Sequence, residues 1–119
     1  MILYGIPNCN SIKKTINWFQ SQHLEYQFHN YKEDGITLAK LKEWNKKSGW
    51  KTFFNKSSST WKLQKIDFVS LTTATALTLM KAHPSIIKRP LIEYGEKIII
   101  GFDETLFKKI FLTIKKETK

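Results

Sequence analysis

Hydrophobic and polar residues follow two different periods along the first thirty positions. A short apolar run at residues 2–5 predicts a strand, and residues 10–22 predict a helix with one apolar face. The apolar positions of that helix recur at spacings of three and four: Ile12, Ile16 and Phe19. From Tyr26 to Tyr31 aromatic and polar residues alternate, which predicts a second strand. The helical crossover favours a parallel arrangement of the two strands.

The middle of the chain is mostly helical in pattern. Helices are predicted over Thr37–Ser48, ended by Gly49, and over about Thr72–Ala82, capped by Thr72 or Thr73. Trp50 to Lys65 shows neither period, and the aromatic residues on both sides of its polar run favour an ordered, irregular loop.

The last third of the chain carries a hairpin pattern. Strands are predicted at residues 90–94 and 97–101, joined by Gly95-Glu96, with a helix following from about Asp103 to Lys115. The order β-α-β, helices, β-β-α describes one α/β domain with a mixed four-stranded, thioredoxin-like sheet. We expect its core at about residues 1–34 and 86–119, with a helical insertion at about 35–85.

Composition narrows the class of protein. The chain has 119 residues, 41% of them hydrophobic, which suits a single compact domain. Its 20 basic and 10 acidic residues give a net charge of +10, yet Arg89 is the single arginine. Proteins that read nucleic acid specifically rely on arginine, so we expect a solvated basic face and no specific nucleic-acid binding. Such a face suits an anionic small molecule such as glutathione.

Cys9, the sole cysteine, stands where the first strand gives way to the helix. A helix N-terminus stabilises a thiolate, so Cys9 is a candidate nucleophile; the alternative is a small apolar residue packed under the first turn. Asn8, Asn10 and Ser11 form a possible anion cradle, or alternatively only a turn and a cap. Lys13, with Lys14, adds positive charge that could lower the thiol pKa.

The same sequence indicates a compartment. One cysteine permits no internal disulfide, and the first apolar run breaks at Gly5-Ile6-Pro7 without a charged leader. We therefore expect a cytoplasmic monomer with no membrane segment. His23, His29 and His83 are dispersed, so no metal site is expected.

Several segments together resemble a known family. They are Gly5 to Lys14 (GIPNCNSIKK), Tyr31-Lys32, Gly35-Ile36, Gly49-Trp50, residues 54–61 (FNKSSSTW), residues 83–90 (HPSIIKRP) and residues 100–102 (IGF). In this order and spacing they resemble the ArsC/Spx family, and most of all the YffB-type, ArsC-like reductases. The resemblance covers nearly the whole chain.

The resemblance implies roles for matching residues. Cys9 matches the nucleophile of arsenate reductases that use glutathione and glutaredoxin, in which the thiolate attacks arsenate and glutathione joins the adduct. Arg89 matches an anion-binding arginine, and Pro90 matches the cis proline that follows it. On this basis we expect a glutathione-dependent monothiol reductase in which Arg89 orients an anionic group beside Cys9.

The chain also departs from the family pattern. Arsenate reductases of this type carry further arginines near the positions of Asn55 and Ile100, and this chain has neither arginine. Their absence puts arsenate as substrate in doubt. Lys56 could supply charge there, although an ammonium lacks the two-pronged guanidinium geometry. Spx-type regulators, which bind the C-terminal domain of the RNA polymerase alpha subunit, commonly carry a second cysteine where Ile12 stands. A non-catalytic Spx-like adaptor is the alternative hypothesis.

The four tryptophans complete the set of candidate residues. Trp18, Trp44, Trp50 and Trp61 are expected to fill the core and the insertion interface. Trp61 and Phe54 could instead line a substrate cleft.

Overall fold

A four-stranded mixed sheet forms the middle layer of the molecule. In this computed structural model, residues 1–112 are described. The strands are β1 (Ile2–Gly5), β2 (Gln27–Asn30), β3 (Leu91–Tyr94) and β4 (Lys97–Ile100), in the spatial order β2-β1-β3-β4. β1 is parallel to β2 and antiparallel to β3, which is antiparallel to β4. The predicted mixed sheet, parallel start and C-terminal hairpin are confirmed.

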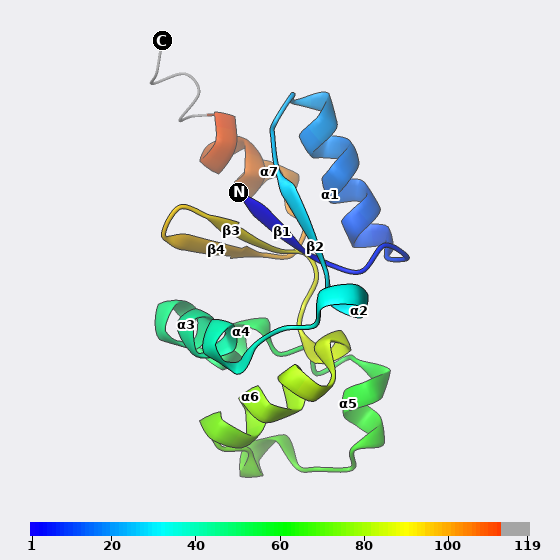
Figure 1. Cartoon of the computed structure of the whole chain (residues 1–119), viewed down its shortest axis with the longest axis vertical. Coiled ribbons are helices and arrows are strands. Elements are labelled where there is room, and N and C mark those ends of the chain that lie inside the picture. Colours follow the sequence, from blue (N-terminus) through cyan, green and yellow to red (C-terminus); the bar gives the residue numbers. More distant parts are fainter. Residues whose placement is uncertain (113–119) are drawn as a thin grey trace.

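Helices cover both faces of this sheet (Figure 1). α1 (Asn10–Ser21) and α7 (Glu104–Phe107) lie on one side, where α7 continues as a π-helical turn, η3 (Lys108–Leu112). The other side holds the segment between the two halves of the sheet. Its elements are α2 (Tyr31–Asp34), α3 (Leu38–Ser48), α4 (Trp50–Phe53), α5 (Ser59–Leu63), α6 (Thr73–Ala82) and the 3-10 turns η1 (Phe68–Ser70) and η2 (Pro84–Ile86).

Alternation along the strands gives the sheet two buried faces. Leu3 and Ile92 pack with α1 and α7, whereas their neighbours Tyr4 and Leu91 pack with the helices of the insertion. All four side chains are buried. Because successive side chains of a strand point to opposite faces, one sheet serves two hydrophobic clusters.

The predicted helix boundaries depend on side-chain caps that the structure confirms. The Thr37 hydroxyl accepts a hydrogen bond from the Lys40 amide (3.1 Å), and Gly49 ends α3 with φ of 79°. Thr72 and Thr75 form a reciprocal capping box at the start of α6. Each cap satisfies a backbone N–H that has no partner within the helix.

Two expectations need correction, and a third is confirmed for the residues that the structure describes. Residues 50–65 are not irregular throughout, because α4 and α5 form there and place the aromatic side chains inside. The second strand ends at Asn30, whose side chain caps α2, so Tyr31 is helical. The predicted final helix is helical to Leu112, with a π-helical second half, and its remainder lies outside the described residues.

A polar cluster ties the insertion to the sheet. One carboxylate oxygen of Glu93 accepts from the Tyr4 hydroxyl (2.6 Å), and the other accepts from Trp44 Nε1 (2.8 Å) and Lys40 Nζ (3.1 Å). Further along the chain, a β-bridge pairs Phe54 with Ile87. The insertion is thus joined to the core by hydrogen bonds as well as by apolar packing.

Within residues 1–112, no helix combines the length and the apolar character that crossing a membrane demands.

Candidate functional site

The lone thiol lies at the junction of β1 and α1. Cys9 is the N-cap residue of α1, with extended backbone angles, and its carbonyl accepts the first helical hydrogen bond from the Lys13 amide (3.0 Å). Its side chain is half-buried. No side-chain hydrogen bond caps this helix. The unpaired N–H groups of the first turn are therefore left to the Cys9 sulfur or to a ligand.

Because Gly5 has no side chain, the Ile12 side chain of α1 packs directly against β1. A Cβ at Gly5 would collide with the side chain of Ile12, which is fully buried in the first turn of α1. This close approach fixes the loop of residues 6–9 and with it the position of the thiol.

The surroundings of Cys9 favour its ionised form. Burial raises the pKa of the thiol, but the backbone N–H of Ile12, the neighbouring Arg89 side chain and the backbone N–H of Ser11 lower it by more. The pKa of Cys9 is therefore below its ordinary value. Because the thiolate is the reactive form, this shift increases the nucleophile available near neutral pH.

Arg89 reaches the thiol from the far end of the sequence. Its bond to Pro90 is cis, as the family resemblance implied, and Pro90 is buried where β3 begins. Arg89 Nη1 donates to the carbonyl oxygen of Ser85 (3.2 Å), which orients the guanidinium. The Ser85 hydroxyl in turn donates to Thr60 Oγ1 of α5 (2.9 Å). No pattern in the sequence marks Ser85 or Thr60 as supports of Arg89.

The other predicted site residues are distributed unevenly. Ser11 is half-buried and contributes its backbone N–H at the thiol, whereas Asn8 and Asn10 are exposed beside Cys9 in the chain. Lys13, like Lys14, is exposed on α1. The positive side chain that acts on the Cys9 pKa is that of Arg89.

Lys56 is placed by the insertion. Its ammonium lies 4.4 Å from the centroid of the Phe68 ring, a cation–π contact within the insertion. The Asn55 side-chain oxygen accepts a hydrogen bond from the Ser57 backbone amide (3.1 Å). The Asn55 backbone amide donates to the Ile86 carbonyl oxygen (2.7 Å). These contacts order the loop next to the segment that leads to Arg89.

Tyr31 is a buried phenol near Arg89 that the sequence pattern does not mark as a site residue. Tyr31 is 4% exposed, and its hydroxyl has no hydrogen-bond partner among the described residues. Burial, and to a lesser degree electrostatic repulsion from the Tyr4 phenolate, raises the pKa of Tyr31, while the positive charge of Arg89 opposes the rise. As the last residue of an alternating aromatic pattern, Tyr31 looked like an ordinary strand residue.

The aromatic residues of the insertion belong to its core. Phe54 and Trp61 are both buried, with ring centroids 4.9 Å apart in an edge-on contact. Trp18, Trp44 and Trp50 are buried as well, as expected. The described residues include no group of three His, Cys, Asp or Glu side chains that could hold a metal ion.

Comparisons with known proteins agree with this architecture. Residues 4–110 match the model of the ArsC family. The solved structure of the YFFB (PA3664) protein is 36% identical in sequence, with a TM-score of 0.82 over 91% of this chain and 96% of that one. An arsenate reductase (ArsC) related protein from Brucella melitensis is 30% identical, with a TM-score of 0.73 over 92% of each chain.

A regulator is among the relatives too. The global transcriptional regulator Spx of Lactiplantibacillus plantarum is 24% identical over 106 residues, which cover 87% of this chain and 80% of the regulator. The family match runs from Tyr4 within β1 to Ile110 within η3 and includes both Cys9 and Arg89. With its thioredoxin-like mixed sheet and helical insertion, this chain belongs to the ArsC family.

Proposed function

We propose that this protein is a cytoplasmic, glutathione-dependent monothiol reductase in which Cys9 is the nucleophile. The observation that carries the proposal is the Cys9 thiol itself, half-buried at the start of α1 with a pKa lowered by two backbone N–H groups and by Arg89. Enzymes that act through a cysteine need such an activated thiolate.

Arg89 has a second role in this proposal. Its guanidinium is held by the Ser85 carbonyl, so it is oriented before a substrate arrives. A guanidinium binds a carboxylate or an oxyanion with two parallel hydrogen bonds, which an ammonium does not. We assign Arg89 the task of holding an anionic group, such as a glutathione carboxylate, beside Cys9.

The chain must obtain its second thiol from outside, because Cys9 has no cysteine partner. In the first step the Cys9 thiolate attacks the electrophilic atom of an oxidised substrate such as an oxyanion, one oxygen of that substrate leaves as water, and a covalent bond joins the Cys9 sulfur to the substrate. A glutathione thiolate then attacks the Cys9 sulfur, which releases the reduced substrate and leaves a disulfide between Cys9 and glutathione. A second glutathione, or glutaredoxin, removes that glutathione and frees the thiolate. The sum is one two-electron reduction for two thiols oxidised to one disulfide, and the thiol protons pass to the product and to solvent.

The substrate is defined here only as an oxidant with an anionic group. Arg89 is the single arginine of the chain, so no second guanidinium is present at the site. Asn55 accepts a hydrogen bond from the Ser57 amide, and the Lys56 ammonium lies over the Phe68 ring. We therefore limit the proposal to reduction of a substrate by thiols, with arsenate as one oxidant to be screened.

The first test is the rate of Cys9 alkylation by iodoacetamide as a function of pH. An unperturbed cysteine has a pKa of about 8.5, and we expect the apparent pKa of Cys9 to fall below it. Arg89→Ala should raise that pKa, whereas Lys88→Ala, which removes an exposed charge from the adjacent residue, should leave it unchanged. After incubation with oxidised glutathione, mass spectrometry should find one glutathione on Cys9.

Two results would contradict the proposal. One is an apparent pKa of about 8.5 that Arg89→Ala does not alter. The other is a protein that takes up no glutathione although Cys9 remains accessible to iodoacetamide. Either result would leave Cys9 as a structural residue.

The similarity to Spx supports an alternative, a non-catalytic adaptor that binds the RNA polymerase alpha C-terminal domain. Ile12 stands where Spx-type regulators commonly carry their second cysteine, so such binding here would be independent of an internal disulfide. Titration of the chain with that domain separates the two functions. A complex that forms equally well with Cys9→Ser would favour the adaptor.

A further inference from the structure

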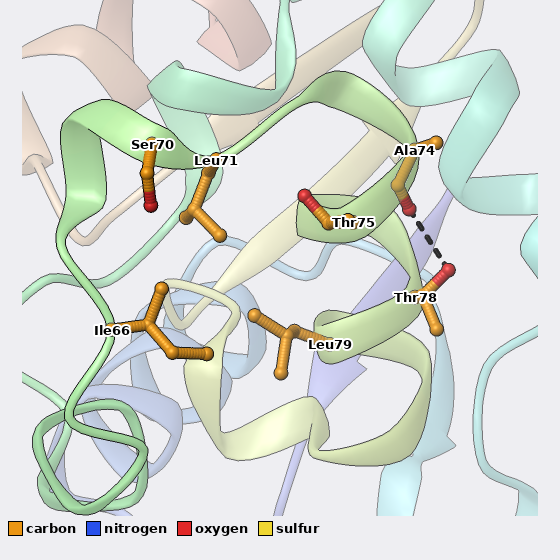
Figure 2. Close-up of a pocket in the computed structure, with 7 residues that line it drawn as sticks. All are labelled: Ile66, Ser70, Leu71, Ala74, Thr75, Thr78 and Leu79. Carbon is orange, nitrogen blue, oxygen red and sulfur yellow. Dashed lines mark hydrogen bonds between the residues drawn. The ribbon is translucent and has the colours of Figure 1, made fainter.

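An open apolar groove lies in the insertion, between the segment that contains η1 and helix α6. It encloses about 470 Å³ and is lined by Ile66, Ser70, Leu71, Ala74, Thr75, Thr78 and Leu79. Figure 2 shows the side chains of Ile66, Leu71 and Leu79 converging on it from the two sides. The residues of the Cys9 site do not take part in this groove.

The hydroxyl groups that line the groove already have partners. Thr78 Oγ1 donates to the Ala74 carbonyl (2.8 Å, dashed in Figure 2), and Thr75 Oγ1 donates to the Thr72 carbonyl (3.1 Å). Ser70 Oγ donates to the Asp67 carbonyl (2.7 Å). Because these groups are satisfied within their own segments, the groove offers mainly methyl and methylene surface. Its occupant is therefore recognised by apolar side chains.

Exposed aliphatic residues continue the apolar surface along the chain. Leu63, Ile66 and Val69 are 75%, 41% and 87% exposed, and they recur at a spacing of three. Only Leu106 is a further large exposed hydrophobic residue in the described part of the chain. Exposed large apolar side chains gathered in one segment, next to an apolar groove, are typical of an interaction site.

The charge of the chain segment that carries the groove indicates the chemistry of a partner. Lys62 and Lys65 are exposed beside Leu63 and Ile66. Asp67 is the sole acidic residue between Trp44 and Ile92, a stretch that carries nine cationic residues: Lys46, Lys47, Lys51, Lys56, Lys62, Lys65, Lys81, Lys88 and Arg89. Two copies of a chain with net charge +10 would repel one another through this face.

We propose that the groove between the η1 segment and α6 binds an acidic amphipathic helix of another protein. Apolar residues on one face of that helix enter the groove, and its acidic residues meet Lys62 and Lys65, the exposed lysines next to Leu63 and Ile66 in the chain. Docking there leaves Cys9 open, so a bound partner and thiol chemistry coexist on one molecule.

The test uses a fluorescein-labelled synthetic peptide of about 18 residues, long enough to form a helix, with Leu on one face and Glu and Ala elsewhere. A second peptide carries Lys in place of every Glu. Fluorescence anisotropy against the full chain should show binding of the acidic peptide, little binding of the basic one, and weakening with added salt. Cys9→Ser should bind as the wild type does, which separates this site from the proposed reductase.

Two matched variants locate the binding. Ile66→Ser and Leu106→Ser each remove a partly exposed aliphatic side chain, 41% and 39% exposed respectively. Ile66→Ser should weaken binding by about tenfold, and Leu106→Ser, on α7, should leave it unchanged. Circular dichroism and the unfolding midpoint establish that both variants are folded.

Several outcomes would overturn the proposal. They are equal binding of the acidic and basic peptides, no binding of the acidic peptide, and equal losses in the two variants. Dimerisation of the chain that Ile66→Ser abolishes would assign the groove to a second copy. Binding to anionic lipid vesicles that Ile66→Ser abolishes, without peptide binding, would assign it to a membrane.

Discussion

The missing side chain at Gly5 lets β1 and α1 meet closely enough to position Cys9. A β-carbon there would collide with buried Ile12, so Gly5→Ala should force the start of α1 away from the strand. We expect a loss of about 1–3 kcal/mol in the free energy of unfolding and a slower alkylation of Cys9. Urea unfolding and iodoacetamide kinetics measure the two effects.

A double-mutant cycle separates this collision from a general effect of alanine. Ile12→Ala removes the atoms that a new β-carbon would strike, at the cost of a cavity. The double variant Gly5→Ala/Ile12→Ala should therefore lose less unfolding free energy than the two single variants lose together. Strict additivity would show that the close approach has no role.

At the scale of secondary-structure elements, Glu93 is the residue that joins β3 to both β1 and α3 through its hydrogen bonds. Burial raises the pKa of its carboxyl, but the hydrogen bonds from Tyr4, Trp44 and Lys40 lower it below the ordinary value. The ionised form therefore stabilises the fold. This contribution is complete above the unfolded pKa of about 4.3 and is lost as the pH falls through the lower, folded value.

Glu93→Gln tests this contribution. At neutral pH we expect the variant to lose about 1–3 kcal/mol of unfolding free energy, because an amide nitrogen replaces one acceptor. The difference from wild type should shrink as the pH falls below about 4.3. Glu96→Gln, at the exposed turn of the same hairpin, is the control and should cost little. A loss that does not change with pH would refute the role of the charge.

Elements with a sustained period were predictable, and the short ones were not. α1, α3, α6 and the hairpin each have repeated apolar positions or caps, whereas α4 and α5 contain four and five residues, too few to display a helical period. Their aromatic residues are fixed by tertiary packing instead. In the site, the strand, turn and helix pattern located Cys9. Arg89 lies eighty positions away, and only the family resemblance placed it beside the thiol.

The whole molecule has two hydrophobic clusters on opposite faces of one sheet (Figure 1). Trp18 reports on the cluster around α1, and Trp44, Trp50 and Trp61 report on the cluster of the insertion. Because β1 and β3 contribute to both clusters, we expect the two to unfold together. Urea unfolding followed by tryptophan fluorescence and by circular dichroism should give coincident midpoints. A separate early fluorescence transition would show that the insertion unfolds on its own.

α1 has no side-chain cap of the ordinary kind, since the residue at that position is Cys9. Once ionised, the sulfur supplies the negative charge that the end of the helix lacks. The folded protein is thus most stable with Cys9 unmodified. Any group attached to the sulfur removes the negative charge and with it this stabilisation of α1. A thiolate that is a stable anion is also a good leaving group. Adducts on Cys9 should therefore be short-lived in the presence of free thiols, and the resting protein should return readily to its reduced form.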